Sequence, residues 1–410
     1  MSISSYSTVS ASKRTRIWLV GVSFVLFQFF LQLSSGVVIG AIMIDLHLSA
    51  LTAGILSSAL YIVYTTLQVP VGILFDRKNT RSLMAINALI CSLGCFLFAT
   101  SHGLTGLFLG RLLIGAGSSF AFIGLSHLLR QHYPLRQFAF MIGLSETLGF
   151  LATVVGMIVL GTLVTQWGWR GFINMAGIIG LIISYLCWKY IPDTPAFAPS
   201  APHFGPPLVR LLKTKTAWVN GLFVGLTFMV VTTFGALWAA PFIQVKLNCN
   251  LQQASLINAM FFLGTALSCP LFGFLSTQLK KRKPLILSSC LSTTCLLFIL
   301  LYLPTTSHTL VACLMFMIGV CCGAYMLAYT IANELSPAES RSTCTGFTNM
   351  LAMITTPILQ PMIGFLLDAL SKNGLYTLSN YQTALLVIPG SLILAGILAC
   401  FLPEKKRRSE

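Results

Sequence analysis

The chain has 410 residues, of which 56% are hydrophobic and only 8% are charged, and its mean hydropathy is +0.86. Charged residues make up about 25% of an average soluble domain, so this composition excludes a soluble globular protein. The formal net charge of +16 does not indicate a nucleic-acid-binding protein, because the basic residues follow the predicted membrane topology. The apolar run from Ile17 is too long for a signal peptide and lacks a small-residue cleavage site.

Twelve segments are long and apolar enough to cross a bilayer, which takes roughly 20 apolar residues. They cover residues 17–43, 51–75, 82–101, 105–129, 137–163, 169–191, 217–243, 251–278, 284–304, 308–332, 342–369 and 381–403. An even number of spans places both chain ends on one side of the membrane. We therefore expect an all-α membrane protein with twelve transmembrane helices.

The basic residues are concentrated on one side of this topology. Of the 25 lysines and arginines, only Arg170, Lys246 and Lys372 fall on the side away from the termini, while Arg111 lies inside a helix. The positive-inside rule then predicts a multi-pass protein of the bacterial inner membrane with both termini in the cytoplasm.

A polar stretch from Pro192 to Thr216 separates the first six helices from the last six. Its six prolines make a stiff, non-helical connector, and they are followed by Arg210, Lys213 and Lys215. The expected organisation is a cytoplasmic tail, a six-helix bundle, a cytoplasmic linker, a second six-helix bundle and a basic cytoplasmic tail, at residues 1–16, 17–191, 192–216, 217–403 and 404–410.

The two halves share a spacing of residues, which indicates an internal repeat. In the first half, Gly143 lies nine residues after Pro134, and Glu146 lies twelve residues after it. In the second half, Gly346 and Asn349 lie nine and twelve residues after Pro337. The stretch beginning at Gly273 aligns with the stretch beginning at Gly72, although Thr277 stands where the first copy has Asp76. Repeats of this kind place a substrate cavity at their interface, near the bilayer midplane.

The loop after the second helix carries a recognisable motif, Gly72-Ile-Leu-Phe-Asp76-Arg77-Lys78-Asn79-Thr80-Arg81. With Arg111-Leu-Leu-Ile-Gly-Ala-Gly117 in the fourth helix, it resembles the signatures of the major facilitator superfamily, with Asn79 in place of the usual second glycine. The resemblance implies two pseudo-symmetric six-helix halves. It also implies that Gly72, Asp76, Arg77 and Arg81 form a conformational latch that stabilises the outward-open state against the eleventh helix.

Finer sequence features are similar to one group within that superfamily. The stretches Tyr64 to Gly72, Gly117 to Phe122 and Gly168-Trp169-Arg170 resemble the phagosomal nutrient transporters of intracellular bacteria, a group linked to uptake of amino acids and nucleosides. The fifth helix also lacks the Gly-Pro pair that is typical of family antiporters that expel drugs, which favours import.

Two buried charges are candidates for coupling transport to a proton. Glu146 lies about 15 Å past Arg136 along its helix, and a carboxylate at that depth suits a proton carrier. Arg111 could pair with a substrate carboxylate or tune a proton site. The structural alternatives are a neutral glutamate that locks two helices and an arginine that packs against backbone carbonyls or snorkels outward.

Polar and aromatic side chains recur on several helices and predict a cavity lining, since polar groups are costly when they face lipid. The alternative for each residue is a hydrogen bond between helices. The substrate-binding candidates are Gln28, Gln32, Tyr61, Tyr64, Arg111, Trp238, Asn258, Tyr325, Tyr329 and Asn349. Such a lining suits a small polar solute with one or two charges. We assign no site role to Asp45 or Asp368, at the outer ends of helices.

The sequence contains no nucleotide-binding loop or metal-ligand cluster, so we expect no cofactor, no metal and no enzymatic activity. We predict a monomeric secondary transporter, surrounded by lipid, that imports a small polar nutrient, with an amino acid as the leading guess, together with H+ by alternating access. An exporter of a polar metabolite or siderophore is the alternative. A nutrient receptor that does not transport is a more remote one.

Overall fold

The computed structural model describes residues 10–193, 212–279, 281–335, 341–371 and 375–402. Most of the predicted linker and nearly all of both predicted tails lie outside these residues. The helices are α1 (Ala11–Leu33), α2 (Ser35–Asp45), α3 (Ala50–Arg77), α4 (Thr80–Thr100), α5 (Leu104–His132), α6 (Leu135–Tyr190), α8 (Lys215–Met229), η1 (Val230–Trp238), α9 (Ala239–Leu247), α10 (Leu251–Leu279), α11 (Lys283–Tyr302), α12 (His308–Cys321), η2 (Cys322–Ala324), α13 (Tyr325–Leu335), α14 (Arg341–Ile354), α15 (Thr356–Leu370), α16 (Leu378–Ala384) and α17 (Val387–Ala399).

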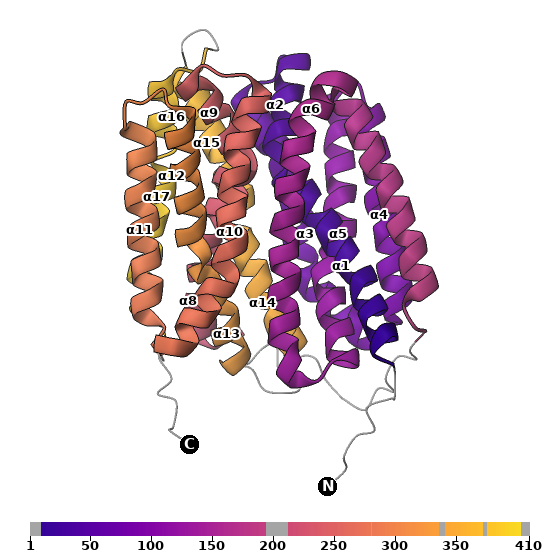
Figure 1. Cartoon of the computed structure of the whole chain (residues 1–410). Coiled ribbons are helices and arrows are strands. Elements are labelled where there is room, and N and C mark those ends of the chain that lie inside the picture. Colours follow the sequence, from indigo (N-terminus) through magenta and orange to yellow (C-terminus); the bar gives the residue numbers. More distant parts are fainter. Residues whose placement is uncertain (1–9, 194–211, 280, 336–340, 372–374, 403–410) are drawn as a thin grey trace.

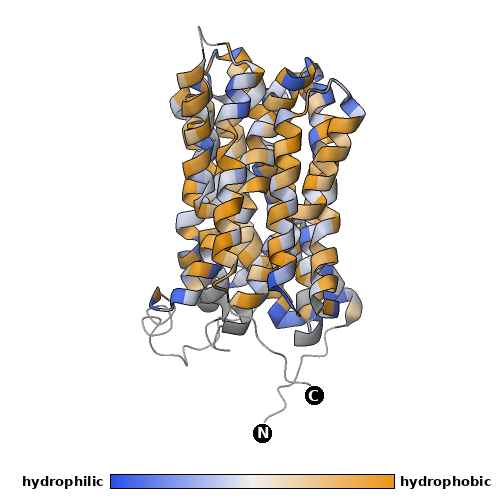
Figure 2. Cartoon of the chain, turned by 90° about the vertical axis from the view of Figure 1, so that its left-hand side faces the viewer, coloured by the Kyte–Doolittle hydropathy of each residue, from blue (hydrophilic) through white to orange (hydrophobic). Residues whose placement is uncertain are grey.

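Twelve helices in the described residues are long and apolar enough to cross a membrane, which confirms the predicted number. Large apolar side chains such as Val155, Ile178 and Leu291 are exposed on the outside of the bundle. Figure 2 shows hydrophobic residues along the length of the helices and hydrophilic residues mainly toward the two ends. This surface matches a bilayer and not water.

The helices form two halves that stand side by side, α1 to α6 and α8 to α17 (Figure 1). Two long contacts join the halves: α3 packs against α14 and α15, and α6 packs against α10. These pairs correspond under the internal repeat, because α14 carries Asn349 and α6 carries Glu146. The predicted pair of pseudo-symmetric six-helix halves is confirmed.

Several spans are interrupted. The first breaks between α1 and α2 at Ser34, close to Gly36. The seventh contains a π-helical segment, η1, and such segments are frequent at functional sites. The fifth and sixth spans share the label α6, but they are two helices, as expected, that meet at a kink at Gly168, where φ is 71°.

The bundle has two chemically different ends. We call the end at which α1 begins the basic face; Arg81, Arg130 and Lys283 lie near it, at helix ends. We call the other end the opposite face; Asp45 ends α2 there and Asp368 lies near the end of α15. The cavity described next lies between the middle of the bundle and the basic face.

Candidate functional site

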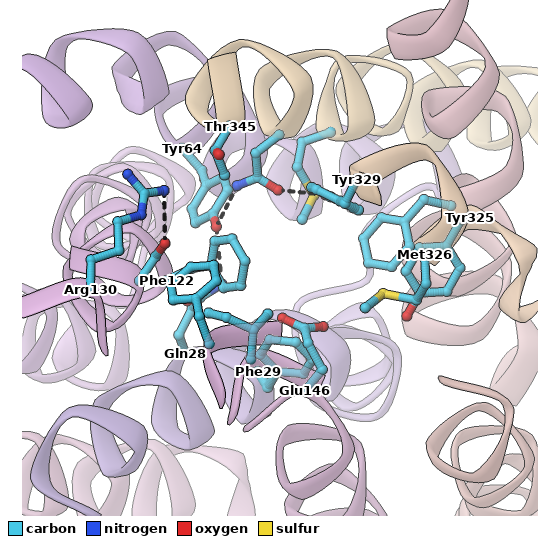
Figure 3. Close-up of a pocket in the computed structure, with 16 residues that line it drawn as sticks. Gln28, Phe29, Tyr64, Phe122, Arg130, Glu146, Tyr325, Met326, Tyr329 and Thr345 are labelled. Carbon is cyan, nitrogen blue, oxygen red and sulfur yellow. Dashed lines mark hydrogen bonds between the residues drawn. The ribbon is translucent and has the colours of Figure 1, made fainter. Parts of the chain in front are cut away.

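A cavity of about 70 Å³ lies between the two halves (Figure 3). The first half contributes Gln28, Phe29, Tyr64, Phe122, Ser126, Arg130, Phe138, Ile142 and Glu146; the second contributes Phe228, Tyr325, Met326, Tyr329, Thr345, Asn349 and Met353. Aromatic walls with a few polar groups are typical of a small-molecule site.

Two glutamines of α1 meet two tyrosines of α3, and of these four residues Gln28 and Tyr64 line the cavity. The amide nitrogen of Gln28 donates to Gln32 Oε1 at 3.0 Å and to the Tyr64 hydroxyl at 3.2 Å. Tyr61 donates to the backbone oxygen of Gln32 at 3.3 Å. Gln28 is only 1% exposed, and its Oε1 atom has no partner among the described residues. Gln28, a residue of the cavity lining, therefore has a buried acceptor without a donor in the described part of the structure.

Asn349 links the halves across one side of the cavity. Its Oδ1 atom accepts a hydrogen bond from the Tyr329 hydroxyl at 2.9 Å. Its Nδ2 atom donates to Gln68 Oε1 at 2.8 Å and to the Tyr64 hydroxyl at 3.3 Å. Tyr64 thus accepts two hydrogen bonds, which leaves its own hydroxyl hydrogen for an acceptor.

Glu146 faces the same cavity from α6, as Figure 3 shows. Its side chain is buried, with 8% of the residue exposed, and no hydrogen bond or ion pair joins its carboxyl group to another described residue. A buried charge without a partner is costly at this depth, which marks the residue as functional by default. The nearby Tyr325 hydroxyl instead lies 3.4 Å from Cys269 Sγ.

Arg130 also lines the cavity, although it falls one residue past the predicted span 105–129 and was therefore expected in a cytoplasmic loop. Its Nη2 atom donates to Ser126 Oγ at 3.3 Å, and its guanidinium carbon lies 5.4 Å from the centre of the Phe138 ring. The sequence held a signal for this position, since Phe122, Ser126 and Arg130 are four residues apart and share one face of α5.

Arg111 does not line the cavity. Its Nη2 atom donates to Ser35 Oγ at 2.7 Å and to the Ser57 backbone oxygen at 3.4 Å, inside the first half. Its Nε atom has no partner among the described residues. These contacts fit the helix-packing alternative, and in this arrangement they hold Arg111 away from Glu146's cavity.

The structure brings six of the predicted site residues into one cavity and leaves the others outside it. Gln28, Tyr64, Glu146, Tyr325, Tyr329 and Asn349 line the cavity, whereas Gln32, Tyr61, Arg111, Trp238 and Asn258 do not. Asn258 donates to the backbone oxygen of Gly235 in η1 at 2.9 Å. Trp238 is buried in η1 with an Nε1 atom that has no partner among the described residues.

The loop motif contributes contacts within the first half. Arg81 forms an ion pair with Asp193 at 3.7 Å, and its guanidinium lies 4.5 Å from the Trp188 ring. Asn79 also donates a hydrogen bond to Asp193. Gly72 lies in α3, while the side chains of Asp76 and Arg77 are outside the described part of the structure.

The sequence matches a family model described as the Major Facilitator Superfamily over residues 19–359 and 222–410. A probable galactarate/D-glucarate transporter, GarP of Escherichia coli, is 22% identical over 89% of both chains. A hexuronate transporter of Bacillus subtilis is 22% identical over 87% of this chain and 85% of its own. Probable anion transporter 5 of Arabidopsis thaliana is 26% identical over 35% of this chain and 33% of its own.

Two solved structures share the fold at low sequence identity. A bacterial homologue of the human lysosomal transporter Spinster, inward-facing and unoccupied, is 16% identical with a TM-score of 0.76, covering 96% of this chain and 97% of its own. The nucleoside transporter NupG is 16% identical with a TM-score of 0.72, covering 95% of this chain and 98% of its own. All these proteins are transporters. The chain is therefore a multi-pass secondary transporter, and it belongs to the Major Facilitator Superfamily.

Proposed function

We propose that this protein imports a small polar carboxylate together with a proton. The observation that carries the proposal is Glu146, a buried acid without a described partner that lines the cavity between the halves. A carboxyl group in such a place can bind a proton on one side of the membrane and release it on the other. Rocking of the halves would then alternate access to the cavity.

The polar groups of the cavity support a solute with a carboxylate and further hydrogen-bonding groups. Arg130 offers a guanidinium, the residue type that binds carboxylates best. The Tyr64 hydroxyl can donate, and Gln28 Oε1 can accept. One hydroxyl of a solute can satisfy both, because a hydroxyl donates and accepts.

Amino acids and hydroxylated acids both carry a carboxylate, so both belong to the proposed class. An ammonium group could satisfy Gln28 or Glu146 but cannot accept from Tyr64. The names of the relatives, a galactarate/D-glucarate transporter and a hexuronate transporter, also favour a hydroxylated acid over an amino acid.

We base the direction of import on the fifth helix, which lacks the Gly-Pro pair typical of family antiporters that expel drugs. If the basic face is cytoplasmic, as the positive-inside rule predicts, the cavity lies between the bilayer midplane and the cytoplasm. The protein would then act as a monomer in the inner membrane. The Gly72, Asp76, Arg77 and Arg81 loop would act as the latch of the opposite, outward-open state.

The test begins with thermal stabilisation of the purified protein by amino acids, sugar acids and nucleosides. Each stabilising compound is then tested for uptake into proteoliposomes with an inward proton gradient. Accumulation of a carboxylate that requires the gradient supports the proposal. Accumulation that requires an outward gradient supports the export alternative, and stabilisation without any transport supports the receptor.

A further inference from the structure

The opposite face contains a carboxylate that the proposed site does not use. Asp368, near the end of α15 in the second half, reaches the beginning of α3 in the first half. Its Oδ1 atom accepts the Ala50 N–H at 3.0 Å, and its Oδ2 atom accepts the Leu51 N–H at 2.9 Å. Both carboxylate oxygens are thus bound to one helix terminus of the other half.

Tyr376 completes this contact from the segment after α15. Its hydroxyl donates to Asp368 Oδ1 at 2.6 Å and accepts the Ala50 N–H at 2.9 Å. Burial raises the pKa of Tyr376 to about 12, so the phenol remains a hydrogen-bond donor at neutral pH. The cluster of Asp368, Tyr376 and the first two N–H groups of α3 is hereafter the aspartate clasp.

The chemistry of the clasp suits a strong contact. The first N–H groups of a helix have no partner within the helix, and the helix dipole makes this end positive. A carboxylate that accepts two such N–H groups forms charge-assisted hydrogen bonds, which are roughly twice as strong as neutral ones. The clasp therefore joins the halves by more than apolar packing.

The helix backbones beneath the clasp touch each other. A Cβ atom on Gly54 of α3 would lie 2.6 Å from the backbone oxygen of Gln360 in α15, and one on Gly364 would meet the backbone oxygen of Ala50. On the neighbouring helix pair, a Cβ atom on Gly36 would lie 2.6 Å from the backbone oxygen of Leu237. These contacts bring backbones of the two halves together between the cavity and the opposite face, and the clasp lies at the outer end of the α3–α15 contact.

Asp45 provides a comparison on the same face. It accepts hydrogen bonds from Arg170 at 2.8 Å and from Trp169 at 3.1 Å. Both partners belong to α6, in the same half as Asp45, so that pair does not join the halves. Of these two carboxylates, only Asp368 must lose hydrogen bonds, those to the Ala50 and Leu51 N–H groups, if the halves separate at this face.

We infer that Asp368 is a positioning residue that holds the opposite face closed while the cavity lies toward the basic face. The inference rests on the proposed transport function for its role in a cycle. Each opening toward the opposite face must break the two N–H contacts of Asp368, and each closure must form them again. The clasp thereby affects the ratio of the conformations open toward the basic face and toward the opposite face, and it does not take part in substrate binding in the cavity.

The test measures that ratio directly by distances between spin labels. One pair, at His102 and Thr309, reports the opposite face; a second pair, at Lys78 and Lys281, reports the basic face, and all four positions are exposed. Two sets of native cysteines are first replaced by alanine. One is the set that is exposed or half-buried among the described side chains, Cys249, Cys295, Cys313, Cys321 and Cys400, and the other is Cys344, whose side chain lies outside the described part of the structure. The proteins are compared in liposomes without substrate, as wild type, Asp368→Asn and Asp45→Asn.

Asparagine has the shape of aspartate, but its amide nitrogen would face an N–H group that needs an acceptor. We expect Asp368→Asn to raise the ratio of long to short distances at the opposite face about tenfold, with the reverse change at the basic face. Asp45→Asn should leave both distributions as in the wild type. Unchanged distributions in Asp368→Asn, or equal shifts in the two variants, would overturn the inference.

Tyr376→Phe keeps the test decisive if Asp368→Asn does not fold. This variant loses the two hydrogen bonds of the Tyr376 hydroxyl but keeps both backbone N–H contacts of Asp368, and we expect a smaller shift in the same direction; no shift would again overturn the inference. Asp368→Glu keeps the carboxylate, so its ratio of long to short distances at the opposite face should lie between the ratios of the wild type and Asp368→Asn. The distance measurements need no substrate. They can therefore contradict the role of Asp368 while carboxylate uptake supports the proposed function, or support that role while no uptake is found.

Discussion

Glu146 and Asn349 face one cavity from opposite halves, and only Asn349 has hydrogen-bond partners among the described residues. They occupy equivalent places in the repeat, twelve residues after Pro134 and Pro337. Asn349 holds α14 to α3 of the other half. In the repeat alignment, Cys269 stands where α3 has Gln68, so α10 has no amide side chain at the position equivalent to the partner of Asn349. One copy of the site is thus a structural junction, and the other retains an acid that has no hydrogen-bond partner in the described part of the chain.

Asn349→Ala should destabilise the protein, because it removes three hydrogen bonds, two of which cross between the halves. Hydrogen bonds between membrane helices contribute about 0.6 kcal/mol each on average, so we expect a loss of about 1 to 2 kcal/mol. The measurement is thermal unfolding in detergent. Tyr329→Phe removes only one of the three bonds and should lower the Tm less; an equal or larger decrease would contradict this assignment.

Arg130→Ala should weaken binding of the carboxylate substrate. Losing a charge-assisted hydrogen bond in a cavity costs about 1.5 to 3 kcal/mol, which corresponds to a KM at least tenfold higher. The kcat should change less, since Arg130 is not the proposed proton carrier. Arg16→Ala is the matched control, because Arg16 lies near the same face but stacks on Tyr190 outside the cavity. An unchanged KM in Arg130→Ala would remove this residue from the site.

Gly54→Ala should disturb the contact between α3 and α15, because its Cβ atom would lie 2.6 Å from the backbone oxygen of Gln360. We expect a lower Tm and a shift toward conformations that are open at the opposite face. Gly40→Ala is the control, since nothing lies within 4 Å of its added Cβ atom. Alanine in a helix is favoured over glycine by up to about 1 kcal/mol, so Gly40→Ala should keep or raise the Tm. Equal effects of the two changes would contradict a tight contact at Gly54.

The sequence predicted the spans and the repeat, because both depend on local composition and spacing. Glu146 and Asn349 were found in this way, and their helix positions place them at similar depth. Arg130 was assigned to a loop because it lies two residues from the end of α5, although it shares a helix face with Phe122 and Ser126. Asp368 was missed for another reason: its partners are backbone N–H groups more than 300 residues away, which no sequence pattern reveals.

The same limit applies to Arg111 and to the residues of η1. Burial in a helix was predictable for both, but the direction of each side chain was not. Arg111 is bound to Ser35 and Ser57 of the first half, and Trp238 is buried in a π-helical segment that shifts the register of its neighbours. Which polar residues meet in a cavity depends on such rotations, since one residue turns a helix face by about 100°.

The exchange of labelled for unlabelled substrate across the membrane shows whether Glu146 is needed to couple transport to a proton or to bind the substrate. Glu146→Gln keeps the size of the side chain but cannot take up or release a proton. We expect this variant to exchange substrate across the membrane at a rate comparable to wild type, with no dependence on external pH. Wild-type exchange should remain faster than gradient-free net uptake. Loss of exchange in Glu146→Gln would assign the residue to substrate binding instead.

The most direct test of proton-coupled import is uptake of a stabilising carboxylate into proteoliposomes with an inward proton gradient and no substrate gradient. We expect the wild type to accumulate the substrate above its external concentration. Collapse of the gradient by a protonophore should abolish this accumulation, and Glu146→Gln should not accumulate it under any condition. Accumulation by Glu146→Gln equal to that of the wild type, or wild-type uptake that ignores the gradient, would contradict a proton carried by Glu146.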